Sequence, residues 1–158
     1  MNGSTGNMAS GAPEQRGEII LSLSTVQRML PLVQRIVDDI LLHQKALVRL
    51  SPEQDRLDRQ RRTLAWPERQ PRYQLREDVL TAENGLQTAL HELQELGVAL
   101  LDPELGRVGF PTRVNDKPAY FSWHPGDESL QHWHFAEDNV FRPIPTSWLK
   151  EISWAGKN

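Results

Sequence analysis

Two long stretches of the sequence place apolar side chains at alternating steps of four and three residues. The first seam spans residues 29–50, and His43 is the polar residue within it. The second spans residues 75–96, with Gly85 interrupting its middle. This heptad spacing is typical of helices that pack lengthwise against each other. The pattern therefore predicts two long helices that form an antiparallel hairpin.

Capping residues and prolines suggest how the first helix begins and where it can bend. Ser24 and Gln27 form a capping-box pattern, which predicts that Ser24 is the N-cap of this helix. Pro31 and Pro52 are the two positions at which the helix is expected to kink. Residues 53–64 are highly charged and are predicted to continue the helix as a solvated extension.

The end of the hairpin and the start of the second helix are predicted from prolines and a glycine. Residues 66–71 contain two prolines and are expected to form the reversal loop. The second helix is then predicted over residues 72–96, and Gly97 stands at its C-cap position.

After Gly97 the apolar period changes to short runs separated by turn residues. These runs predict four strands in an antiparallel meander, at residues 98–101, 107–111, 118–124 and 130–135. All aromatic residues except Trp66 and Tyr73 lie beyond position 109, as the preference of aromatic side chains for strands favours. The expected fold class is α+β, a long antiparallel helical hairpin packed with a small antiparallel β-meander.

Composition suggests how the chain divides. Residues 1–18 are rich in Gly, Ser and Asn and are expected to be a disordered tail. Residues 19–158 are expected to form a single domain. Within it we predict the helical hairpin at 19–97, the aromatic-rich meander at 98–145, and a short helix and tail at 146–158.

Composition also excludes several classes of function. The 158 residues include no cysteine, which rules out disulfides, thiolate metal sites and a cysteine nucleophile. The net charge of −3 argues against nucleic acid as a partner. No apolar run is long enough to span a membrane, so a cytoplasmic protein is expected. The familiar hydrolase, nucleotide-binding and zinc-protease motifs are not found, so we do not expect an enzyme.

The apolar face of the first helix is wider than one neighbouring helix can cover. A second apolar stripe, Leu30, Val37, Leu41 and Val48, runs beside the heptad seam. Such a face needs a sheet, another chain or both to cover it. We therefore expect a two-fold homodimer and a non-enzymatic assembly or adaptor role. The predicted interface residues, some of which must face the second helix instead, are Met29, Val33, Ile36, Val37, Ile40, Leu41 and Leu47.

Three histidines suggest an alternative function, the binding of a metal or small ligand. His132 and His134 alternate along a predicted strand and would lie on one face, roughly 6.6 Å apart. His124 ends the preceding strand and would supply a third imidazole to a divalent transition metal. In the competing interpretation the two strand histidines line a solvated face, while Trp133 and Phe135 pack onto the helices. A crevice between sheet and hairpin would be the natural pocket, with walls from Trp123, Trp133 and Phe110.

The order of three motifs resembles a known bacterial family. They are the Leu-Pro-Leu helix start at 30–32, the Gly-Phe-Pro strand at 109–111, and Trp123 followed by Trp133-His134. Over roughly residues 21–144 the chain is similar to the domain of unknown function number twenty-two zero three. At Ser122 the family tends to carry a cysteine, and the glycines that the family has around Phe141 are missing here. The resemblance implies a shared fold and no known activity.

Overall fold

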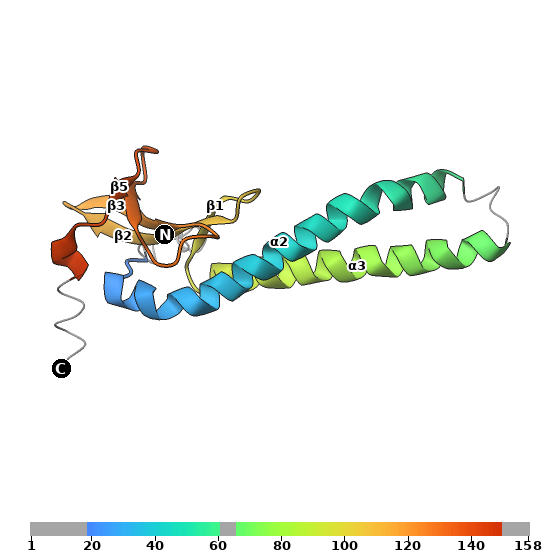
Figure 1. Ribbon diagram of the computed structural model, residues 1–158, viewed down its shortest axis with the longest axis horizontal. Coiled ribbons are helices and arrows are strands. Elements are labelled where there is room, and N and C mark those ends of the chain that lie inside the picture. The colour runs from blue at the N-terminus through green and yellow to red at the C-terminus, as the bar shows by residue number, and fades with distance from the viewer. Residues whose placement is uncertain (1–18, 61–65, 150–158) are drawn as a thin grey trace, which may run out of the picture.

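The computed structural model describes residues 19–60 and 66–149. Helix α2 (Leu23–Arg59) and helix α3 (Trp66–Glu95) lie side by side in opposite directions, and a five-stranded antiparallel sheet packs at one end of the pair (Figure 1). The predicted α+β fold and the helical hairpin are confirmed. The predicted tail at 1–18 lies outside the described residues.

Helix α2 begins two residues earlier than the capping-box pattern predicts. Its N-cap is Ser22, whose Oγ accepts a hydrogen bond from the Thr25 backbone N–H at 3.2 Å. Starting there makes Leu23 helical, so Leu23 and Val26 lie on the same side of the helix and are both buried. The prediction of Ser24 as N-cap is therefore wrong, because core packing of Leu23 favours the earlier start.

Prolines lie inside both helices of the hairpin. Helix α2 continues through Pro31 and Pro52 as one element to Arg59, so the charged extension is helical that far. The predicted reversal loop at 66–71 is wrong, because α3 already begins at Trp66. A proline at the second helical position removes an N–H that has no partner within the helix, so Pro67 is tolerated there.

Gly97 ends α3 as predicted. Its φ of 78° is left-handed, which glycine adopts without a Cβ penalty. The Gly97 N–H donates to the Gln94 carbonyl at 2.9 Å, and the Val98 N–H donates to the Leu93 carbonyl at 3.2 Å. This pair of hydrogen bonds is the Schellman motif, and it turns the chain directly into the first strand.

The sheet follows the predicted meander and adds one short strand. Its order is β1 (Ala99–Asp102), β2 (Arg107–Val114), β3 (Lys117–Trp123), β4 (His132–Phe135) and β5 (Arg142–Pro143), with neighbours antiparallel. The two-residue strand β5 is not predicted, because prolines interrupt its segment. Residues 146–149 form the described part of the predicted C-terminal helix.

The two faces of the sheet have different roles. The inner face packs onto the first half of α2 and the end of α3 to form the core. The register of the strands places its main residues together, namely Val108, Phe110, Phe121, Trp123 and Trp133. Trp148 adds to this layer, with its ring 5.7 Å from that of Trp133. The opposite set, which we call the outer face, includes Arg107, Gly109, Tyr120, His132 and His134.

The core covers much of the apolar face from which a homodimer is predicted. Four of the seven predicted interface residues, Val33, Ile36, Val37 and Ile40, are at most 4% exposed within the single chain. Met29 and Leu41 pack against the same core, and Leu47 is half-buried. The chain's own sheet covers this face of α2 as far as Leu41, whereas Val48 of the second stripe is 77% exposed.

Beyond the sheet, α2 and α3 continue as a two-helix arm (Figure 1). The core ends at Leu41 in α2 and Leu86 in α3, so we define the arm as residues 42–59 together with the part of α3 before Leu86. Near its far end, the Arg72 guanidinium contacts the Asp58 carboxylate at 2.9 Å and ties the helices together. No helix in the described ranges combines the length and apolar character that a membrane span requires.

Candidate functional site

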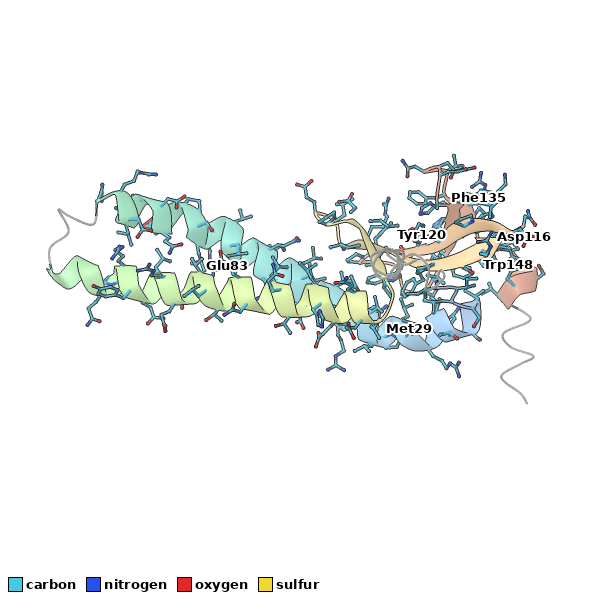
Figure 2. The ribbon with its side chains drawn as sticks, turned by 180° about the vertical axis from the view of Figure 1, so that it is seen from behind. Met29, Glu83, Asp116, Tyr120, Phe135 and Trp148 are labelled. Carbon is cyan, nitrogen blue, oxygen red and sulfur yellow. The ribbon has the colours of Figure 1, made fainter. Side chains whose placement is uncertain are left out.

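The outer face of the sheet holds a pocket of about 430 Å³. Four strands and the loop between β4 and β5 contribute to it, and Figure 2 shows the position of Tyr120 on the sheet. Both polar and apolar groups line it, which is typical of small-molecule sites. The lining residues are Leu101, Asp102, Arg107, Tyr120, His134, Ala136, Asn139 and Phe141.

Gly109 allows two of the lining side chains to meet over β2. A Cβ at this position would lie 2.8 Å from the Leu101 Cδ1 and 2.8 Å from the Tyr120 Cδ1. Both distances are too short for real carbon atoms, so any larger residue would push these side chains apart. The glycine therefore fixes the side of the pocket where Leu101 and Tyr120 approach each other.

His134 is the most unusual group in the pocket, because its side chain is polar and only 4% exposed. Its Nδ1 lies 2.8 Å from the Phe135 carbonyl oxygen and 3.1 Å from that of Asp138. A carbonyl can only accept, so Nδ1 carries the proton and donates to both oxygens. In the neutral ring, Nε2 then holds a lone pair. That Nε2 is buried and has no hydrogen-bond partner in the part of the chain that the structure describes.

Two aromatic rings cover the imidazole of His134. The Tyr120 ring lies across the strand pair with its centroid 5.6 Å away, and the Phe141 ring meets His134 edge to face at 4.9 Å. Phe141 comes from the loop before β5 and is 39% exposed. It also contacts Arg107, whose Cζ lies 4.7 Å from its ring centroid. Phe141 therefore contacts both the cation and the imidazole of the pocket.

The charges of the pocket are only loosely paired. Asp102 is the register partner of Arg107, but its Oδ1 accepts the backbone N–H groups of Glu104 and Leu105 at 3.1 and 3.2 Å. Within the described residues, no carboxylate lies within ion-pair distance of the Arg107 guanidinium. The pocket thus presents a guanidinium without a carboxylate partner and an acceptor nitrogen without a donor.

The structure does not bring the three predicted metal ligands together. His132 is half-buried on the outer face, where it pairs with Ser122 and Pro143. His124 lies at the end of β3, where its Nδ1 is 2.8 Å from the carbonyl oxygen of the next residue, Pro125. Among the described residues, no three His, Cys, Asp or Glu side chains are placed to hold one metal ion.

The competing interpretation of these strand residues is confirmed in its alternation. His132 and His134 lie on the outer face, and Trp133 and Phe135 lie on the inner one. The prediction that this face is solvated is wrong for His134, because the loop at 136–141 covers its imidazole.

A second cavity lies where the crevice between sheet and hairpin is predicted. It measures about 270 Å³ and is bordered by α2 and the loop after β3. Trp123 lines it, as expected, whereas Phe110 and Trp133 belong to the core. The remaining lining residues are Gln34, Asp38, Pro125, Gly126, Asp127 and Glu128.

Sequence reasoning finds His134 but misses its neighbours Arg107, Asn139 and Phe141. Alternation along β2 places Arg107 on the same face as Gly109, and this signal is present in the sequence. Its proximity to the ring of Phe141 depends on how the loop between β4 and β5 folds back, and no local pattern predicts that.

The fold and the pocket define an α+β protein with a helical arm and a ligand-sized site on the outer face of its sheet. The family described as "Uncharacterized conserved protein (DUF2203)" matches residues 20–141, and the chain belongs to this family. The matched region includes every residue that lines the pocket. No curated protein and no solved structure matches the chain.

Proposed function

We propose that the chain is a binding protein that holds a small polar molecule in the pocket around His134. The observation that carries this proposal is the Nε2 of His134, which is buried and unpaired. A buried acceptor without a donor destabilises a fold by about 1–3 kcal/mol, and native structures contain few of them. A ligand that donates a hydrogen bond to Nε2 recovers this loss, so the pocket favours a molecule with an O–H or N–H group.

The route to Nε2 passes the Phe141 side chain. Nε2 has almost no exposed surface, and the edge-to-face contact of Phe141 covers the ring. Because Phe141 is 39% exposed on a loop, its side chain can rotate outward without disturbing the core. Binding in this scheme exchanges a ring contact for a hydrogen bond.

Nuclear magnetic resonance of the imidazole nitrogens tests the proposal. We would titrate ¹⁵N-labelled protein with a set of small alcohols, amides, phenols and hydroxy acids and follow the His134 resonances. We expect at least one class to shift Nε2 of His134, and His134→Phe to lose that binding, because phenylalanine keeps a ring but removes the acceptor. The matched control, His132→Gln, alters the same face outside the pocket and should bind as the wild type does.

Thermal melting of His134→Phe verifies that the variant is folded. The titration of the wild type needs no variant, so it decides the question even if His134→Phe fails to fold. If no member of the set shifts the His134 nitrogens, or if both variants bind equally well, the pocket is not the binding site.

We also propose self-association as a second function, now through the arm. The observation that favours it is the exposure of apolar side chains on the arm, where each helix has only the other as cover. Pairing two such arms into a four-helix bundle would bury them. The residues concerned are Leu42, Val48, Tyr73 and Leu80, which are 50–77% exposed.

Light scattering over a range of protein concentrations tests self-association. We expect a dimer at high concentration and a shift toward monomer in Val48→Glu, because a carboxylate would be buried in the bundle. Leu32→Glu is the control, since Leu32 is 48% exposed on α2 outside the arm. A wild-type chain that stays monomeric at every concentration contradicts this second function.

A further inference from the structure

The Phe141 ring occupies a position between a cation and an imidazole. Its centroid is 4.7 Å from the Arg107 Cζ and 4.9 Å from the His134 ring, which it meets at 86°. The pocket therefore accepts a flat apolar ring at this place. The same place is next to the two unpaired groups of the pocket, the Arg107 guanidinium and the His134 Nε2.

A neutral ring satisfies neither of these groups. A guanidinium over an aromatic face gains much less than one that makes two parallel hydrogen bonds to a carboxylate or phosphate. Likewise, an edge-to-face ring gives Nε2 no conventional donor. A ring that carried an anionic group toward Arg107 and an O–H toward His134 would retain the ring contacts and add both missing interactions.

Asp102 restricts the charge of that anionic group. Its carboxylate lines the pocket and is the register partner of Arg107. The two side chains together leave the lining close to neutral, so a ligand with a single negative charge is favoured. A phosphate ester carries up to two negative charges near neutral pH and would be repelled by Asp102 more strongly than a carboxylate.

We infer that the ligand class of this pocket is a small aromatic hydroxy acid, which displaces the Phe141 ring, places its carboxylate on Arg107 and donates its hydroxyl to His134. This inference rests on the proposed function of the pocket and specifies its ligand. A volume of about 430 Å³ suits a ligand with one ring.

Calorimetric titration with 4-hydroxybenzoate and three related compounds tests the ligand class. Benzoate lacks the hydroxyl donor, 4-hydroxybenzamide lacks the charge, and 4-hydroxyphenyl phosphate keeps the hydroxyl but replaces the carboxylate. We expect 4-hydroxybenzoate to bind best, and benzoate and 4-hydroxybenzamide each to bind about tenfold more weakly, the size of one hydrogen bond or ion pair in a buried site. Tighter binding of 4-hydroxyphenyl phosphate would overturn the carboxylate assignment.

Two variants connect these preferences to the residues. Arg107→Gln should bind 4-hydroxybenzoate about tenfold more weakly, because the amide cannot replace the ion pair. It should bind 4-hydroxybenzamide as the wild type does, a result that a misfolded variant would not give. Arg28→Gln is the matched control, since Arg28 is exposed on α2 away from the pocket, and it should bind all four compounds unchanged.

Displacement of Phe141 is tested separately. Phe141→Ala removes the competing ring and should bind 4-hydroxybenzoate several-fold more tightly, whereas Val140→Ala changes an exposed neighbour and should have no effect. If Phe141→Ala instead weakens binding as much as Arg107→Gln does, Phe141 contacts the bound ligand. The inference that the ligand displaces the Phe141 ring is then wrong.

The outcomes separate this inference from the proposed function. If neutral compounds shift the His134 nitrogens while 4-hydroxybenzoate binds no better than 4-hydroxybenzamide, the pocket is a binding site and the ligand class is wrong. If neither the neutral compounds nor the acids shift His134, both the function and the ligand class fail.

Discussion

The two helices are packed in different ways along their length. In the half next to the sheet, Val26, Val33, Val37 and Ile40 have no exposed surface. In the arm, Leu42 is 61% exposed and Val48 is 77% exposed. Figure 1 shows the reason, because the sheet forms a third layer over one half of the hairpin and leaves the other half bare.

The comparison shows that a heptad seam does not by itself set how deeply its residues are buried. The seam continues from one half of α2 into the other, and α3 covers it in both. What differs is the inner face of the sheet, which contributes large side chains such as Phe110 and Trp133 only to the near half. The near half should therefore supply most of the stability of the fold.

The largest expected effect is a loss of stability on substitution of a buried leucine, which we compare between the two halves of the hairpin. Leu93 is 2% exposed in the core, and Leu57 is 6% exposed in the arm. We expect Leu93→Ala to lower the free energy of unfolding by about 3–4 kcal/mol and Leu57→Ala by about 2 kcal/mol. The removed atoms are the same, but the two-helix arm can close the cavity or admit water more easily than the three-layer core.

Urea denaturation monitored by circular dichroism measures both leucine variants. The exposed residue Leu32, on α2 outside the arm, supplies a control, and Leu32→Ala should change the stability by less than about 0.5 kcal/mol. Equal losses at Leu93 and Leu57 would show that the arm is packed as firmly as the core.

The sequence predicts the fold well where the signal is periodic. Heptads give both helices, and alternation with turn residues gives four of the strands. The predictions fail at the ends of elements, as at Ser24 and at residues 66–71, because packing of Leu23 favours an earlier start of α2 and because α3 includes the prolines of its first two turns. Periodicity likewise cannot say which layer covers an apolar face, and the sheet covers that of α2 only as far as Leu41.

The candidate site is predicted only in part. Alternation along β4 correctly separates His134 from Trp133, and it places the histidine on the outer face. It cannot show that the loop at 136–141 folds back over that face and buries the imidazole. The same folding of the loop brings the Phe141 ring onto Arg107, and it depends on contacts between residues distant in sequence.

A smaller effect is expected where the two halves meet, at the pair His43 and Gly85. A Cβ built on Gly85 would lie 2.5 Å from the Cε1 and Nε2 atoms of His43, so the imidazole packs directly on the glycine of α3. This contact explains why the seam of α2 contains a histidine and why the seam of α3 is interrupted by glycine. We expect Gly85→Ala to destabilise the wild type by about 1 kcal/mol, because the ring must leave a packed position.

In the His43→Ala background the same substitution should have the opposite sign. With the imidazole gone, alanine fits beside α2, and its higher helix propensity should stabilise the protein by about 0.5–1 kcal/mol. Urea denaturation of the four members of this double-mutant cycle measures the coupling between the two positions. A Gly85→Ala effect of the same sign and size in both backgrounds would mean that packing against His43 is not the reason for a glycine at position 85. The two positions would then contribute independently to the stability of the junction between core and arm.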